Sequence, residues 1–220
     1  MIKCANEGLG QNDLMKKVIQ ISLALIAWFA VITQYFLMIE NKVAPVAETT
    51  VRFFSFFTIL TNFIVAIYFT FAPMNFKDRF SKFLSKPATL TAITVYILVV
   101  GLVYQVILRQ IWEPKGLQMV VDELLHTVIP SAVLLYWVFS EGKSEVTYKA
   151  LPAWLIYPLV YLVFVLIRGY ISAFYPYPFT DVNVLGYYKV FINSVGLLFA
   201  FLALSVLFIA ISKASNRNVR

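Results

Sequence analysis

A single histidine and a carboxylate four residues before it form the most reactive pair in this 220-residue sequence. His126 and Asp122 would share one face of a helix, because residues four apart are neighbours on a helical surface. The carboxylate could accept an imidazole N–H and fix its tautomer, which leaves the other ring nitrogen free to take a proton from a hydroxyl. The pair therefore indicates a catalytic base with its orienting group. The same histidine could instead serve only in packing and hydrogen bonding.

A second polar stripe supplies the hydroxyl groups. Ser55, Thr58 and Asn62 fall within about 60° of one another at about 100° per helical residue, and Arg52 extends the stripe. A hydroxyl, a histidine and a carboxylate are the parts of a nucleophile, base and orienter system. We expect the two stripes to face one common chamber, in which Asn62 or backbone N–H groups support an oxyanion.

Further polar residues are candidates for binding a substrate. Arg168 is a permanent charge that could pair with Asp122 or Glu123, or hold the carboxylate or phosphate of an amphiphilic ligand. Pro130 cannot donate to the His126 carbonyl, so we expect a kink there and a free acceptor in the cavity. The predicted substrate-binding residues are Asn62, Arg168, Gln105, Tyr177 and Asn193.

The sequence favours neither a metal nor a cofactor nor nucleic acid. One histidine, the remote Cys4 and scattered carboxylates do not make a zinc site, and there is no glycine-rich phosphate loop or G-x-S-x-G elbow. The net charge is +7, but the basic residues stand at the ends of apolar segments rather than on one solvated face. We expect lipids as partners, and the sequence leaves the oligomeric state open.

The elements that must position these residues are six apolar segments. Hydrophobic residues make up 61% of the chain and charged residues 13%, too few charges to cover a water-facing surface. A membrane-spanning helix needs about 20 mostly apolar residues. The segments are roughly 18–39, 50–72, 88–109, 118–139, 152–173 and 187–211. The predicted fold is all-α, a polytopic bundle of six transmembrane helices over 18–212, with a polar segment 1–17 and a basic tail 213–220.

The distribution of lysine and arginine predicts the orientation. Twelve of the 18 basic residues would lie on one side, five on the other, and Arg168 within a helix. The larger group is Lys3, Lys16, Lys17, Lys77, Arg79, Lys82, Lys86, Lys143, Lys149, Lys213, Arg217 and Arg220; the smaller is Lys42, Arg52, Arg109, Lys115 and Lys189. Both termini should therefore be cytoplasmic, in a multi-pass protein of the plasma (inner) membrane. The amides and charges then gather in the outer half of the bilayer, where we expect them to face one another around a shared cavity.

Three short motifs resemble the androgen-induced and androgen-dependent integral membrane proteins, which hydrolyse fatty-acid esters of hydroxy fatty acids. They are Arg52-Phe53-Phe54-Ser55-Phe56, His126-Thr127-Val128-Ile129-Pro130 and Tyr177-Pro178-Phe179. Their order and helices agree with that family over most of the chain, and the pattern is most similar to a bacterial six-helix branch. The resemblance implies a nucleophile at the family's threonine position, here Ser55, with His126 as the base. A shift of alignment would move the nucleophile to Thr58 or Thr61, of which Thr58 shares the Ser55 face.

Three functions are compatible with these patterns. The first is a lipid-ester hydrolase that forms an acyl-enzyme at Ser55 or Thr58. The second is a transporter or lipid-binding protein that uses Arg168, Asp122 and His126, although the chain has no evident internal repeat. The third is a membrane assembly protein whose polar residues only join helices.

Overall fold

The computed structural model describes residues 2–74 and 78–214, and every regular element in these ranges is helical. The main helices are α1 (Ile2–Glu40), α2 (Val46–Phe53), α3 (Phe57–Phe71), α4 (Arg79–Leu84), α5 (Pro87–Val106), α6 (Leu117–Glu123), α7 (Ile129–Phe139), α8 (Leu151–Ser172) and α9 (Val182–Ala214). The all-α prediction is confirmed. Residues 215–220 of the expected basic tail lie outside the described residues.

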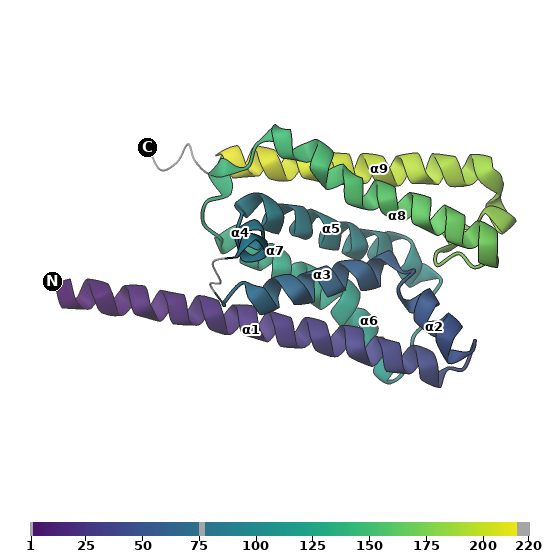
Figure 1. The fold of residues 1–220 in the computed structure, drawn as a ribbon, viewed down its shortest axis with the longest axis horizontal. Helices are drawn as coiled ribbons and strands as arrows, with labels where there is room; N and C mark the ends of the chain where they lie inside the picture. Colours follow the sequence, from purple (N-terminus) through teal and green to yellow (C-terminus); the bar gives the residue numbers. More distant parts are fainter. Residues whose placement is uncertain (1, 75–77, 215–220) are drawn as a thin grey trace.

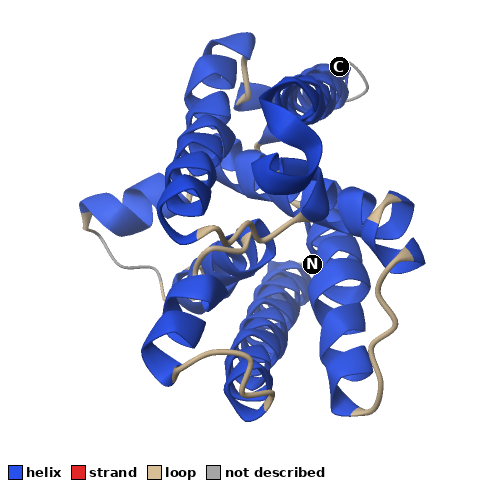
Figure 2. Ribbon diagram, turned by 90° about the vertical axis from the view of Figure 1, so that its right-hand side faces the viewer, coloured by secondary structure: helices blue, strands red, loops and turns tan. Residues whose placement is uncertain are grey.

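The helices form one bundle with a peripheral pair. In Figure 1, α1 runs along one side, α8 and α9 lie together along the other, and α3, α5 and α7 fill the space between them. Figure 2 shows the same bundle from its right-hand end, without strands among the drawn elements. The two pairs α1–α3 and α5–α7 make the closest packing, so the core sits between these four helices.

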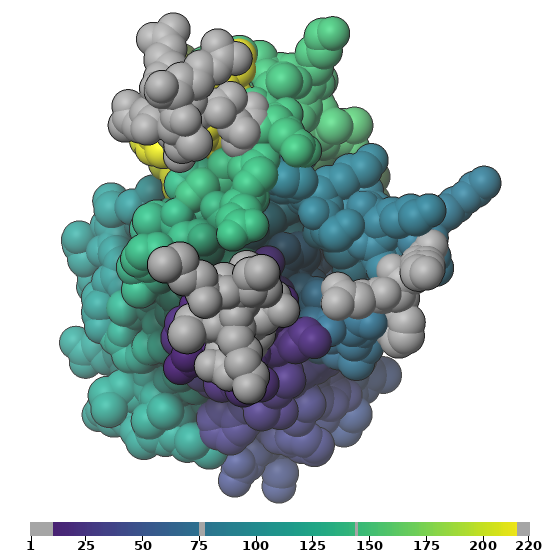
Figure 3. All heavy atoms as spheres, turned by 90° about the vertical axis from the view of Figure 1, so that its left-hand side faces the viewer, coloured from purple at the N-terminus to yellow at the C-terminus, as the bar shows by residue number. Residues whose placement is uncertain are grey.

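The chain begins and ends at the same end of the bundle. The start of α1 and the end of α9 both lie on the left in Figure 1. Figure 3 looks onto that end, where α4 projects to one side and the connection from α7 to α8 lies between α1 and α9. The connections α1–α2, α5–α6 and α8–α9 are all at the opposite end. The polar residues predicted for the outer half therefore lie at the end remote from both termini.

Five described helices are long and apolar enough to cross a membrane, or six if one bent pair counts as a single span. They are Gln11–Glu40, Pro87–Gln110, Leu117–Phe139, Tyr148–Ser172 and Val182–Ala214, with Val46–Phe53 and Phe57–Phe71 as the bent pair. Helix α9 (Val182–Ala214) is interrupted at Gly186, whose φ of 73° and ψ of 160° only glycine adopts without strain. The predicted helix 187–211 starts at this interruption.

The predicted single helix 50–72 is broken, which corrects the sequence-based expectation. The axes of α2 and α3 differ by 72°, and residues 54–56 form the turn. The Tyr161 hydroxyl, from α8, accepts from Phe57 N at 3.2 Å and donates to Ser55 O at 2.8 Å. The Tyr177 hydroxyl accepts from Thr58 N at 3.1 Å. Two tyrosines thus replace backbone partners that a continuous helix would supply.

A turn of π-helix, Leu124–Val128 (η2), joins α6 to α7 directly before Pro130. The wider turn accommodates a proline that cannot complete the α-helical pattern. The His126 carbonyl does not face the cavity as the sequence suggested. It lies against α5, where a Cβ on Gly101 would stand 3.0 Å from this oxygen and 3.3 Å from Pro130 Cβ. Glycine at position 101 therefore allows α5 to approach the histidine backbone closely.

Candidate active site

A cavity of about 440 Å³ opens near the end of the bundle remote from the termini. Its walls come from the end of α1, the start of α3, the end of α5, the α6–η2 segment and the loop before α9. The polar residues on it are Gln34, Asn41, Thr58, Tyr104, Gln118, Asp122, His126 and Tyr177. From the two predicted polar stripes, Thr58 on α3 and Asp122 and His126 on the α6–η2 segment line this cavity. Ser55 and Asn62, expected on the same wall, do not line it.

His126 is held in one tautomer by its own helix. Its Nδ1 lies 2.9 Å from the Asp122 backbone oxygen, and because a carbonyl only accepts, Nδ1 carries the proton. In the neutral ring Nε2 is then the free acceptor. The Asp122 carboxylate is farther away, with Oδ1 at 3.7 Å from Nδ1. The orienting group is therefore the Asp122 carbonyl first and its carboxylate second, which corrects the expected arrangement.

The imidazole is enclosed and fixed in plane. His126 is only 8% exposed, and the Tyr104 ring stacks on it with centroids 4.1 Å apart and planes 12° apart. Asp122 is 6% exposed, and its Oδ2 is buried with no hydrogen-bond partner among the described residues. A histidine that faced lipid would have ruled out a catalytic role, and this one faces the cavity.

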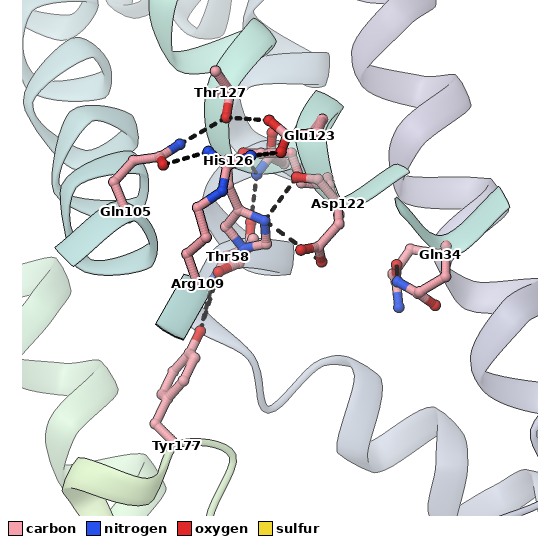
Figure 4. A network of polar contacts seen from close by, with 12 residues as sticks. Gln34, Thr58, Gln105, Arg109, Asp122, Glu123, His126, Thr127 and Tyr177 are labelled. Carbon is pink, nitrogen blue, oxygen red and sulfur yellow. Dashed lines mark hydrogen bonds and ion pairs between the residues drawn. The ribbon is translucent and has the colours of Figure 1, made fainter. Parts of the chain in front are cut away.

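Thr58 is the only serine or threonine among the described residues that line this cavity. Its Oγ1 lies 3.2 Å from the Tyr177 hydroxyl, and Figure 4 shows the imidazole ring between Asp122 and Thr58, with Tyr177 on the far side of the threonine. The Asn62 Nδ2 donates to both Thr58 O, at 2.9 Å, and Leu125 O, at 3.3 Å. Asn62 is fully buried and joins α3 directly to the turn that carries the histidine.

Ser55, the first choice of nucleophile from the sequence, is placed differently. It lies in the turn between α2 and α3 and is fully buried. Its Oγ donates to Val51 O at 2.7 Å, and it does not line the cavity. The break also separates Arg52 from the stripe, because α2 turns away from α3. Between the two hydroxyls, the geometry favours Thr58.

The first turn of α3 also leaves one backbone donor without a partner among the described residues. The N–H groups of Phe57 and Thr58 are capped by tyrosine hydroxyls, and that of Leu60 donates to Phe56 O. Among the described residues the Ile59 N–H makes no hydrogen bond, and Ile59 lines the cavity. An amide at this end of a helix stabilises negative charge. The Ile59 amide directly follows Thr58 in the chain.

Gln105 belongs to a closed ring of hydrogen bonds beside the histidine rather than to the cavity wall. Its Nε2 donates to Thr127 Oγ1 at 2.8 Å, and Thr127 donates to Glu123 Oε2 at 2.7 Å. Arg109 completes the ring, with Nη1 donating to Gln105 Oε1 at 2.6 Å and Nη2 contacting Glu123. Figure 4 shows this ring on the α5 side of His126. It ties α5 to the π-helical turn.

Arg168 does not join Asp122 or Glu123. Its Nη2 lies 2.6 Å from Glu48 Oε1, and Arg52 Nε lies 2.8 Å from the same oxygen. Phe174 packs beside both guanidinium groups, 4.5 Å from Arg52 and 5.7 Å from Arg168. The three charged residues fasten α2 to α8 outside the cavity.

Of two other predicted residues, one lines the cavity and the other holds a loop in place. Tyr177 lines the cavity and contacts Thr58, as described above. Asn193 does not line it: its Nδ2 donates to Phe179 O at 2.9 Å and so holds the loop that carries Tyr177.

Residues missed from the sequence are Glu48, Tyr161, Thr127 and the Ile59 amide. Thr127 had a readable signal, since it lies four residues after Glu123 on the same helix face. Glu48 had a local partner in Arg52, four residues later, but its bond to Arg168 spans 120 residues. The bond from Tyr161 to Ser55 spans 106 residues, so no local pattern marks it.

No group of three or more histidine, cysteine, aspartate or glutamate residues in the described ranges is arranged to hold a metal ion. Comparisons with protein-family models, curated proteins and solved structures found no match to this chain.

Proposed function

We propose that this chain is an integral membrane hydrolase of fatty-acyl esters, with Thr58 as nucleophile and His126 as base. The observation that carries the proposal is that Thr58 and His126 line the same cavity, while the Asp122 carbonyl leaves the histidine Nε2 free to accept a proton. The resemblance of three motifs to the androgen-induced hydrolase family supports the same chemistry. The geometry moves the nucleophile from Ser55 to Thr58.

In the first step the Thr58 Oγ1 attacks the acyl carbonyl carbon, and its proton passes to His126 Nε2. The carbonyl oxygen becomes an oxyanion, which the free Ile59 N–H at the start of α3 would stabilise. The intermediate collapses, the bond to the alkoxy oxygen breaks, and His126 returns the proton to the leaving alcohol. The Thr58 acyl ester remains.

In the second step water replaces the alcohol. His126 takes a proton from the water as its oxygen attacks the acyl carbon, and the fatty acid leaves when Thr58 Oγ1 recovers a proton from the imidazolium. Stacking on Tyr104 keeps the ring in place through both steps. Tyr177, bonded to the Thr58 hydroxyl and amide, is a positioning residue that keeps Oγ1 at the cavity wall.

The basic residues support an orientation in the plasma membrane with both termini in the cytoplasm. Lys16, Lys17, Lys82, Lys86 and Lys213 belong to the end where the chain begins and ends. The cavity then opens in the outer half of the plasma membrane. Ester substrates would reach it from the outer leaflet.

Labelling of the purified full-length protein with an alkyl fluorophosphonate probe tests the proposal. Thr58→Ala and His126→Ala should each lower labelling and p-nitrophenyl ester hydrolysis by about 100-fold or more. Thr61→Ala is the matched control: Thr61 lies on the same helix, is fully buried and bonds Tyr157 instead of lining the cavity. Ser55→Ala should also retain labelling. Unchanged labelling in Thr58→Ala, or equal loss in Thr61→Ala, would refute the assignment.

Lipid binding without turnover is the competing function, and it predicts a different set of results. Arg168 is engaged by Glu48 outside the cavity, so the charge cluster expected for this function is not assembled in one place. Lipid flux in proteoliposomes that persists in His126→Ala, with no ester turnover in the unmodified chain, would favour it.

A further inference from the structure

A second cavity adjoins the first and is almost wholly apolar. It lies between α5, α8 and α9 and is lined mainly by aliphatic residues such as Val99, Val103, Pro158, Leu162, Leu197 and Leu198. We call it the apolar slot. We propose that the apolar slot binds the acyl chain of the ester, an inference that rests on the proposed function.

The two cavities meet at the nucleophile. Thr58 and Tyr177 line both of them, and Leu108 completes the shared wall. A carbonyl carbon held at Thr58 Oγ1 carries an acyl chain on one side and an alkoxy oxygen on the other. The apolar slot and the first cavity, which carries His126 and Asp122, therefore offer separate places for these two parts of one ester.

The few polar groups on the slot are used internally. The Tyr161 hydroxyl donates to Ser55 O, Thr180 Oγ1 donates to Tyr177 O at 2.9 Å, and Ser194 Oγ donates to Val190 O at 2.7 Å. A polar or charged group placed there would lose its water and gain few partners, which is costly. A hydrocarbon chain loses nothing by entering, so the chemistry of the walls selects an apolar occupant.

The sizes of the two cavities support placing the acyl chain in the slot and the alkoxy group in the first cavity. The volume of the slot is about 80 Å³ and that of the first cavity about 440 Å³, so the slot suits a single flexible chain rather than a bulky or branched group. Leu159, which lines the slot, is 42% exposed at the outer surface of α8, the surface that faces lipid in the proposed membrane arrangement. A chain can therefore leave the bilayer sideways into the slot, while a longer chain extends back into lipid.

Filling the slot from α9 tests this assignment. Ser194 is 8% exposed and lines the slot, whereas the next residue, Val195, is 50% exposed on the outside of the same helix. Ser194→Phe should lower hydrolysis of a p-nitrophenyl dodecanoyl ester by about tenfold or more and change that of the acetyl ester by less than about twofold. Val195→Phe, the matched control, should change neither. Ser194→Leu provides a smaller replacement that should act in the same direction.

If Ser194→Phe and Ser194→Leu changed the hydrolysis rates of the dodecanoyl and acetyl esters by the same factor, relative to the unmodified chain, the assignment would be overturned. A binding measurement separates its failure from that of the proposed function. In His126→Ala, a photoreactive diazirine ester with a long acyl chain should label the α8 and α9 residues of the slot, and excess dodecanoyl ester, but not acetyl ester, should prevent this. Labelling that excess ester does not prevent would assign the slot to bulk lipid and refute the inference. Loss of ester turnover in every protein tested, with competed labelling intact, would refute the hydrolase alone.

Discussion

Replacing Tyr177 or Tyr161 with phenylalanine tests whether hydroxyl groups hold the break between α2 and α3. Each tyrosine hydroxyl makes two hydrogen bonds at this turn. Tyr177 accepts from Thr58 N at 3.1 Å and contacts Thr58 Oγ1 at 3.2 Å. Tyr161 accepts from Phe57 N at 3.2 Å and donates to Ser55 O at 2.8 Å. The two variants remove one oxygen each and leave the ring packing intact, so they are matched.

The expected loss of stability follows from the amides left without acceptors. A buried N–H without a partner costs about 1–3 kcal/mol, and for a chain of this size each kcal/mol lowers the unfolding temperature by about 2–4 °C. Tyr177→Phe and Tyr161→Phe should therefore lower the unfolding temperature by similar amounts. Only Tyr177 touches the Thr58 hydroxyl, so Tyr177→Phe alone should also slow fluorophosphonate labelling, by about 10- to 100-fold.

Thermal unfolding in detergent micelles, followed by circular dichroism, measures the first effect, and the labelling rate well below the unfolding temperature measures the second. Unchanged unfolding temperatures in both variants would show that the tyrosine caps do not hold the break. Equal slowing of labelling in both would contradict the positioning role of Tyr177, because the effect would then follow from the turn as a whole.

Three further substitutions probe the support of the site. Gly101→Ala places a Cβ 3.0 Å from the His126 carbonyl oxygen, and this overpacking should lower the free energy of unfolding by about 1–3 kcal/mol. Gly196→Ala, whose Cβ would have nothing within 4 Å, is the control and should be neutral or slightly stabilising in the same thermal assay. Thr127→Val breaks the ring of hydrogen bonds that ties α5 to the π-helical turn and should slow labelling without abolishing it; a labelling rate equal to that of the unmodified chain would show that the ring does not position His126. Glu48→Gln removes the charge shared by two arginines and should lower the unfolding temperature while labelling at low temperature persists; an unchanged unfolding temperature would mean that the ion pairs do not fasten α2 to α8.

The long apolar helices could be predicted from the sequence because their signal is local. The expected segments 88–109, 118–139 and 152–173 agree closely with Pro87–Gln110, Leu117–Phe139 and Tyr148–Ser172. The two stripes that carry Thr58 and His126 were also readable, since helical spacing fixes which side chains share a face. Thr58 and His126 reach one cavity because of that spacing together with the packing of α3 against η2.

The break at residues 54–56 could not be predicted, because no proline or glycine marks it. It depends on hydroxyls from Tyr161 and Tyr177, which are more than 100 residues away in the chain. The choice between Ser55 and Thr58 depended on that break, since Ser55 shares the Thr58 face only in a continuous helix. The pairing of Arg168 with Glu48 has the same origin: it connects residues 120 positions apart.

The shortness of α3 has a consequence for the membrane itself. Its 15 residues measure about 22 Å, whereas the hydrocarbon layer is about 30 Å thick. In the proposed orientation α3 alone is therefore too short to span this layer, and we expect the lipid beside it to thin locally. We expect the threonine at the start of α3 then to lie below the headgroups, at a depth that changes with the chain length of the host lipids. Reconstitution in thin and thick bilayers would vary this depth without any mutation.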